Sequence, residues 1–247
     1  VVGGMASKPE AKGVVVDGLN RITKNNPDSI SKYINNLSKI DNAFNALNTA
    51  YSYDGLVVII PDGMILEKPI QVLYLNSSKD DLVLSTPRNL IVAGKNSQVS
   101  VITNYRGFGD KTYFSNIITE VYVGENAIVD LYKIQNENDE SYHIEKVQAI
   151  QKKNSVFNHY NINFGGAIVR NDINTLHDDQ NIETHYYGLY LAHGKQHIDN
   201  HTFVDHAKPN CMSNELYKGI LDDNSRGVFN GKIIVRRDAQ KTNAYQQ

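Results

Sequence analysis

The sequence predicts an all-β protein, a parallel β-helix with two long strands in each coil, preceded by a segment with one covering helix. Short runs rich in β-branched residues follow one another from Leu56 almost to the C-terminus. Turn-forming corners separate the runs, and several recur at intervals of about 26 to 30 residues, as at Asn126, Asn154 and Gln180, which suits one coil of a solenoid. A large antiparallel sandwich stays open as the alternative, because periodicity alone does not exclude it.

The composition supports a β-rich chain with many turns. The 247 residues include 15 Tyr and no Trp, and they are enough for one large all-β domain. Asn and Gly recur at the corners, where they tolerate positive φ at little cost. We expect a single domain, in which an N-terminal strand and helix segment (1–55) packs on a β-helix core (56–247).

The N-terminal segment contains the one predicted helix. Residues 13–19 indicate a short strand that runs into a turn. Asn26 is a suitable N-cap, Pro27 fits the first helical position, and Asp28 suits the positive end of the helix dipole. Apolar residues follow at helical spacing as far as Tyr51, with a break near residues 39–41, and Gly55 ends the helix. The expected role is to cover the β core, and binding of a partner is the alternative.

The strands of the core fall into two groups. Short ones are predicted first, and longer ones follow after a loop rich in Gly and charge. No helical pattern lies between them, which argues against a doubly wound α/β fold. The predicted strands cover residues 56–60, 70–75, 81–85, 89–94, 98–103, 114–123, 127–135, 143–151, 155–164, 167–176, 182–191, 196–206 and 227–235.

Charge and cysteine content bound the function. The chain carries 25 Lys and Arg against 27 Asp and Glu, a net charge of −2, so it has no strong basic field for nucleic acid or a membrane surface. No apolar stretch is long enough to span a membrane. One cysteine cannot form an internal disulfide, so we expect a reducing, cytoplasmic setting. The sequence begins without Met and without a signal-peptide pattern, and we expect a piece of a longer protein.

The candidate metal ligands are His197, His201, His206 and Cys211. His197 and His201 are four residues apart in a strand-like segment, and on a strand that separation is about 13 Å, too far for one zinc ion. The strand interpretation places His197, Asp199 and His201 on a wetted outer face, with Asn200 and Thr202 inside. A metal site therefore requires ligands from several strands or from two chains.

Cys211 is the only thiol of the chain. It could be a nucleophile, a sulfur carrier or a ligand, and the nearby His206 could lower its pKa. With no third group to orient such a pair, a small buried apolar side chain is the favoured interpretation. The sequence has no nucleotide-binding P-loop, no GxSxG and no CxxC, and we expect no catalytic residues.

One long segment resembles a known family. The runs DNHTFVDHAKPNCMS and ELYKGILDDNSRGVFNGKIIVRRDAQKTNAYQQ closely resemble the SufB/SufD family of the SUF iron–sulfur cluster assembly machinery, and its SufD branch more than its SufB branch. Upstream, FNALNTAYSYDGLVVIIPDGMILEKPIQVLYL is also similar to the family. Together these matches cover most of the chain.

The resemblance implies a right-handed parallel β-helix and a scaffold that is not an enzyme. Such a subunit pairs with a SufB-like partner, β-helix to β-helix, and with a SufC-like ATPase through a C-terminal helical region. The chain is expected to stop before that region and before a CSHG-type motif, and to lack the family's N-terminal helices. No cofactor is expected on this chain alone, and an iron–sulfur cluster is expected at the interface with the partner. The isolated chain is expected to form a homodimer through its C-terminal strands.

Two other functions remain as alternatives. A secreted carbohydrate-active β-helix enzyme would need a groove with stacked aromatic rings and paired carboxylates. A metal-binding module would use histidines between His193 and His206.

Overall fold

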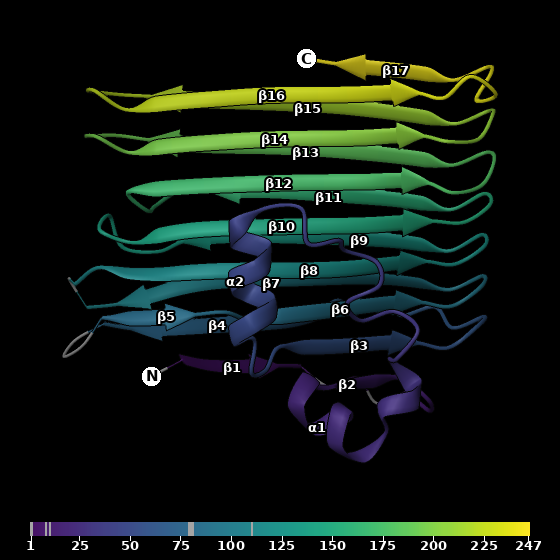
Figure 1. The fold of residues 1–247 in the computed structure, drawn as a ribbon, viewed down its shortest axis with the longest axis horizontal. Helices are drawn as coiled ribbons and strands as arrows, with labels where there is room; N and C mark the ends of the chain where they lie inside the picture. The colour runs from purple at the N-terminus through teal and green to yellow at the C-terminus, as the bar shows by residue number, and fades with distance from the viewer. Residues whose placement is uncertain (1, 8, 10, 79–81, 110) are drawn as a thin grey trace.

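Two β-sheets, in which most strands run parallel, face each other along the solenoid, as Figure 1 shows. The computed structural model describes residues 2–7, 9, 11–78, 82–109 and 111–247. Each coil of the solenoid contributes one strand to each sheet, and about six such turns stack on one another. Residue 81, at the start of one predicted strand, lies outside the described part.

The first sheet, called sheet A, has eight strands in spatial order. They are β1 (Val2–Ala6), β4 (Ile70–Ser77), β7 (Gln98–Phe108), β9 (Ile128–Asn136), β11 (Val156–Asn163), β13 (Glu183–Ala192), β15 (Met212–Leu221) and β17 (Asn243–Gln246). Sheet B consists of β2 (Val15–Gly18), β3 (Leu56–Ile60), β6 (Arg88–Ala93), β8 (Tyr113–Val123), β10 (Tyr142–Gln151), β12 (Ile168–His177), β14 (His197–His206) and β16 (Arg226–Val235), with β5 (Val83–Ser85) beside β8.

The strand directions decide between the two predicted architectures. From β4 and β3 onward, neighbouring strands of each sheet run parallel. Among the strands that the structure describes, only β1 on β4 and β2 on β3 pair antiparallel, at the N-terminal end of the column. The predicted parallel β-helix with two strands per coil is confirmed, and the antiparallel sandwich is wrong.

The interior of the first coils is apolar because alternate residues of each strand point inward. In sheet A, Val99 lies beside Val129 and Val129 beside Phe157, one coil apart at each step. All three are fully buried in the main hydrophobic cluster. This stacking of like side chains gives each coil a continuous apolar core with its neighbours.

Asparagines form a ladder along one edge of the solenoid. Asn96, Asn126, Asn154 and Asn181 all have φ between 56° and 58°, a left-handed conformation that Asn tolerates better than most residues. The side-chain amides of Asn126, Asn154 and Asn181 each donate to the side-chain oxygen of the Asn in the preceding coil, at 2.8, 2.8 and 3.1 Å. The corners predicted at Asn126 and Asn154 are confirmed, and the corner predicted at Gln180 has its positive φ at the next residue, Asn181.

The single long N-terminal helix predicted from Asn26 is wrong. The segment forms α1 (Leu19–Asn25), a 3₁₀ turn η1 (Pro27–Ser29), a series of turns, and α2 (Ala43–Tyr51). The turns cannot continue as a helix because Asn35 has a φ of 62°. The true N-cap is Asn42, whose side chain accepts a hydrogen bond from the Asn45 amide at 2.9 Å.

Glu120 in β8 explains why the turns replace the helix. Its carboxylate accepts hydrogen bonds from the backbone N–H groups of Asn35 at 3.1 Å and Ser38 at 2.9 Å. Arg88 in β6 pairs with the same carboxylate at 3.0 Å, and both side chains are buried. The backbone donors that a helix would use internally are therefore directed at the solenoid.

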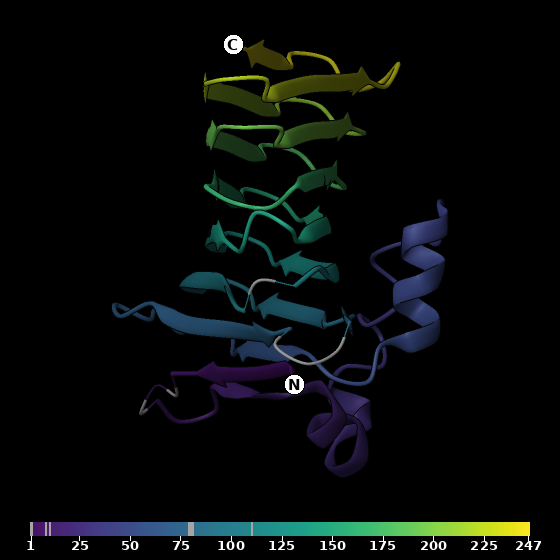
Figure 2. The same ribbon diagram turned by 90° about the vertical axis from the view of Figure 1, so that its left-hand side faces the viewer.

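The helices cover sheet B, as predicted. Figure 2 shows α2 against one side of the column and α1 near its N-terminal end. In α2, Phe44 packs edge-on against Phe114 with ring centroids 6.2 Å apart. Buried Asn48 donates to the carbonyls of Pro87 at 3.1 Å and Asn116 at 2.8 Å. The division of the chain at residue 55 stays a prediction.

Among the described residues, no helix is both long enough and apolar enough to cross a membrane.

Candidate functional site

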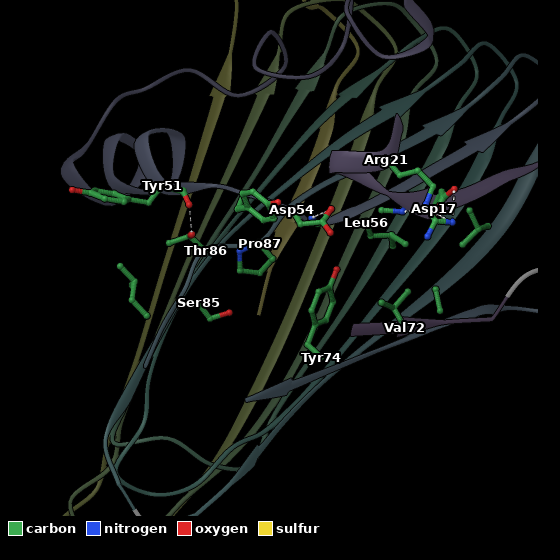
Figure 3. A pocket seen from close by; sticks show the side chains of 16 residues that line it. Asp17, Arg21, Tyr51, Asp54, Leu56, Val72, Tyr74, Ser85, Thr86 and Pro87 are labelled. Carbon is green, nitrogen blue, oxygen red and sulfur yellow. Dashed lines mark hydrogen bonds and ion pairs between the residues drawn. The ribbon is translucent and has the colours of Figure 1, made fainter. Parts of the chain in front are cut away.

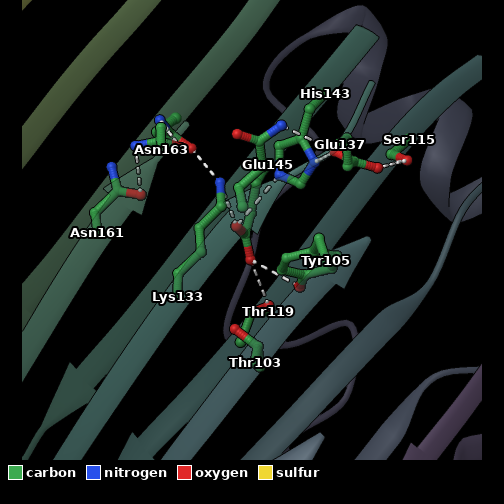
Figure 4. Close-up of polar contacts among 12 residues, drawn as sticks. Thr103, Tyr105, Ser115, Thr119, Lys133, Glu137, His143, Glu145, Asn161 and Asn163 are labelled. Atoms are coloured by element: carbon green, nitrogen blue, oxygen red, sulfur yellow. Dashed lines mark hydrogen bonds and ion pairs between the residues drawn. The ribbon is translucent and has the colours of Figure 1, made fainter. Parts of the chain in front are cut away.

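A buried polar network fills the middle of the solenoid, where the apolar core gives way to charged and amide side chains. Figure 4 shows it between the two sheets. Lys133 of β9 pairs with Glu145 of β10 at 2.9 Å, and His143 of β10 pairs with Glu137 at 2.6 Å. Thr119 of β8 donates to Glu145 at 3.1 Å. Lys133, His143, Glu145 and Thr119 point inward because they alternate along their strands in the same way as the core valines of earlier coils, and Glu137 directly follows β9.

The electrostatics of the network favour charged carboxylates. Burial alone would raise the pKa of Glu145, but the Lys133 ammonium and His143 outweigh it and hold that pKa far below its usual range. Burial would likewise raise the pKa of Glu137, and His143 lowers it. Burial lowers the pKa of Lys133, although the Glu145 carboxylate acts to raise it. The lowered pKa of Lys133 favours a neutral amine, whereas the lowered pKa of Glu145 favours the charged pair. The ion pair is supported by the 2.9 Å contact between Lys133 and Glu145 and by the further hydrogen bond that Lys133 donates to Asn171.

His159 of β11 lies in the same interior and lacks a hydrogen-bond partner on either ring nitrogen within the described chain. Burial lowers its pKa to about 4, opposed by Glu145. The ring is therefore neutral at neutral pH. The charged members of the network are paired with one another, which makes them a source of stability and specificity more than a set of free reactants.

A second cluster joins three buried side chains at one corner of the C-terminal coils. His177 ends β12, His206 ends β14, and Cys211 lies in the corner that follows β14. One donor atom from each of the three lies within 4.8 Å of the other two. His177 and His206 are fully buried and Cys211 is 2% exposed.

The pKa values of this corner are those of a dry site. Burial, followed by the neighbouring His206, holds the pKa of His177 well below its usual value. Burial lowers the pKa of His206 to about 4, opposed by Asp205. Burial raises the pKa of the Cys211 thiol, which favours the interpretation as a buried thiol over activation by His206.

The other two predicted ligands lie elsewhere. His197 and His201 point outward from β14, and His201 pairs with Asp199 at 2.8 Å. Asn200 and Thr202 are buried inside, so the predicted faces of this strand are confirmed. His197 lines an apolar hollow of about 510 Å³ beside Phe44 and Ile168.

His177 is not among the ligands predicted from the sequence. Its backbone is paired in register with that of His206 in the next coil, and their separation of 29 residues is within the interval found between the corners. Reading the chain in steps of one coil would have placed the two histidines together.

A cavity of about 670 Å³ lies at the N-terminal end of the column, as Figure 3 shows. Its polar lining includes Asp17, Arg21, Asp54 and Tyr74. Arg21 pairs with Asp17 at 3.2 Å, and Asp54 accepts from the Asn20 amide at 2.9 Å. Nothing in the sequence pattern pointed to this cavity, because its walls come from five separate segments.

Tyrosines form a stack on the outer face of sheet A. The rings of Tyr132 and Tyr160 are 4.3 Å apart, and those of Tyr160 and Tyr187 are 5.2 Å apart, both in stacked geometry. They come from β9, β11 and β13 at equivalent positions of successive coils. The stack stabilises the outer face, and neither of the two described cavities includes it.

The sequence matches two family descriptions that together span the described solenoid and its N-terminal segment. Residues 74–247 match the SufBD core domain of SUF-system FeS cluster assembly, and residues 5–72 match the SufBD protein N-terminal region.

Curated relatives agree with this match. An iron–sulfur cluster assembly SufBD family protein of Synechocystis sp. is 30% identical over 227 residues, 89% of this chain and 50% of the relative. The iron–sulfur cluster assembly protein SufD of Bacillus subtilis is 26% identical over 242 residues, 96% of this chain and 54% of the relative. SufD of Escherichia coli is 24% identical over 187 residues, 75% of this chain and 44% of the relative.

The chain spans about half the length of the curated relatives it matches. The core-domain match covers both sheets from Tyr74 in β4 to the last strand, which is most of the parallel solenoid. On these grounds the chain belongs to the SufBD family.

Proposed function

We propose that this chain is the β-helical core of a SufD-type scaffold subunit of the SUF iron–sulfur cluster assembly system, without catalytic activity of its own. The observation that carries the proposal is the family match over residues 74–247, which coincides with the parallel solenoid. Similarity to two proteins named SufD supports the SufD branch.

A SufB-like subunit is the proposed partner, and the C-terminal coils are the proposed contact surface. Large apolar side chains are exposed there: Ile220 is 62% exposed, Val235 51% and Tyr245 64%. Exposed apolar groups and strand edges favour pairing with another β-structure. The same surface supports the expected homodimer of the isolated chain. A SufC-like ATPase is a further proposed partner, through a C-terminal helical region of the whole subunit.

We place the iron–sulfur cluster at the interface with the partner, as cargo of the complex. The cytoplasmic location stays a prediction. The carbohydrate-active alternative would share the stacked tyrosines Tyr132, Tyr160 and Tyr187, but the family match favours the scaffold.

Co-expression with SufB and SufC from the same source, followed by anaerobic purification, tests the assignment. We expect a stable complex that carries the chain in defined stoichiometry. A matched control replaces Tyr53, which is 79% exposed far from the C-terminal coils, with Asp, and it should leave co-purification intact. Ile220→Asp should weaken it. Failure of the unaltered chain to co-purify would contradict the proposal, and turnover of a polyuronate would favour the alternative.

A further inference from the structure

We propose that His177, His206 and Cys211 form a binding site for one late first-row divalent cation, with zinc as the representative ion. The proposal concerns side chains inside one corner of the solenoid and does not depend on the scaffold function. It starts from proximity, because one donor atom of each residue lies within 4.8 Å of the other two.

The donor set determines the class of ion. Two imidazole nitrogens and one thiolate sulfur suit zinc and its neighbours, which accept nitrogen and sulfur ligands in tetrahedral or trigonal arrangements. Calcium and magnesium prefer sets of oxygen ligands, and the three donors include no carboxylate. Three protein ligands leave one position of a tetrahedral ion for a further donor.

The hydrogen bonds show which ring nitrogen of His177 and of His206 carries a hydrogen. The Nδ1 atoms of His177 and His206 lie 3.0 Å apart, so they share a single hydrogen. Thr184 donates its hydroxyl hydrogen to Gln151, and it must therefore accept from Nε2 of His177 at 2.7 Å. Nδ1 of His177 then carries a lone pair directed at Nδ1 of His206, which holds the shared hydrogen.

A cation would take the place of that shared hydrogen. His206 Nε2 lies 3.0 Å from the Ser213 hydroxyl, so the hydrogen can move to Nε2 and be donated to Ser213 while Nδ1 becomes a ligand. The imidazoles then remain neutral. The thiol of Cys211 loses its proton, which the buffer takes up. Binding of one divalent ion thus releases one proton and involves no oxidation or reduction.

Neighbouring side chains would hold the ligands in place. Nε2 of His177 is bonded to Thr184 and Nε2 of His206 to Ser213, and both hydroxyls come from strands of sheet A. Ligating histidines in metalloproteins generally have such an outer partner, which fixes the orientation of the ring. The cluster also ties β12 to β14 and to the following corner, so a bound ion would clamp two successive coils.

Zinc titration of the chelator-treated protein under reducing conditions tests the site. We expect one zinc ion per chain in competition with a chromophoric chelator, and calorimetry in buffers of different ionisation enthalpy should give one proton released. Cys211→Ser and His177→Asn should weaken binding by more than about 100-fold, beyond the loss seen on removing an outer partner. The matched controls His197→Asn and His201→Asn change outward-facing histidines and should bind as the unaltered protein does.

Cobalt provides a measurement that needs no variant. The unaltered protein with one equivalent of Co²⁺ should show a thiolate-to-cobalt charge-transfer band with tetrahedral d–d absorption. Absence of stoichiometric zinc binding, a cobalt spectrum without the thiolate band, or full affinity in folded Cys211→Ser would each overturn the proposal.

Discussion

Lys133 and Glu145 form an ion pair of 2.9 Å inside the solenoid, and their side chains are only 2% and 4% exposed. Removing two charges from water is costly, so such a pair persists only where each ion has further partners. Lys133 also donates to Asn171, and Glu145 also accepts from Thr119. The pair therefore fixes the relation of β8, β9, β10 and β12 in the middle of the column.

Breaking the pair from one side should be strongly destabilising. Lys133→Met leaves the Glu145 carboxylate buried without its main counter-ion, and we expect a loss of about 3–5 kcal/mol in the free energy of unfolding. Denaturant titration followed by circular dichroism measures it. The double variant Lys133→Met/Glu145→Leu should recover part of the loss, because no uncompensated charge remains.

The exposed pair Lys95–Glu125, with side chains 51% and 40% exposed, is the control, and Lys95→Met should cost less than about 1 kcal/mol. Equal losses at both pairs would contradict this account.

Acid should destabilise the protein through its buried histidines. The pKa of His159 is about 4 in the folded state and about 6.5 in an unfolded chain. The unfolded state therefore binds the extra proton between these values, and stability falls as pH drops from about 6.5 to about 4, by up to about 1.4 kcal/mol per pH unit for each such histidine. His159→Leu should flatten this slope, as measured by denaturant titration over the pH range. His193→Leu, at a ring whose side chain is 58% exposed, should leave the slope as it is. An unchanged slope in His159→Leu would contradict the prediction.

Two variants of the Asn ladder should distinguish the effect of backbone conformation on stability from the effect of the side-chain hydrogen bonds. Asn126 has a φ of 56° and links Asn96 to Asn154 through its side-chain amide. Asn126→Ala loses both bonds and places Ala in a left-handed conformation that costs about 1–2 kcal/mol. Asn126→Gly loses the same bonds but tolerates the conformation, so it should be the more stable variant in thermal unfolding. If the two variants unfold at the same temperature, conformational strain is not the reason for Asn at these corners.

Local patterns predicted the solenoid well. Runs of β-branched residues and Asn corners at positions such as Asn126 and Asn154 are set by nearest neighbours in the chain, and the structure places them as expected. The helix from Asn26 failed for a non-local reason. Glu120 binds the amides of Asn35 and Ser38 from 85 and 82 residues away, and no local helical pattern contains that information.

The functional residues divide in the same way. The alternation in β14 correctly assigned His201 to the outer face and Thr202 to the interior, because a strand alternates by construction. The cluster of His177, His206 and Cys211 depends on which strands become neighbours. The length of a coil sets which strands are paired. The separation of 29 residues between His177 and His206, about one coil, was the one signal for this cluster in the sequence.

Asn48 should hold α2 on the solenoid. Its amide donates to two backbone carbonyls, those of Pro87 and Asn116, and it is fully buried. Asn48→Ala leaves both carbonyls without this donor, at a cost of about 1–3 kcal/mol, and the effect should be concentrated in the covering segment. We expect faster amide hydrogen exchange across Ala43–Tyr51 and little change in the strands of the later coils. Ala46→Ser, at an exposed position of the same helix, is the control and should leave exchange in α2 almost unchanged. If Asn48→Ala instead accelerates exchange uniformly through the solenoid, α2 is an integral part of the cooperative core and the description of it as a cover is wrong.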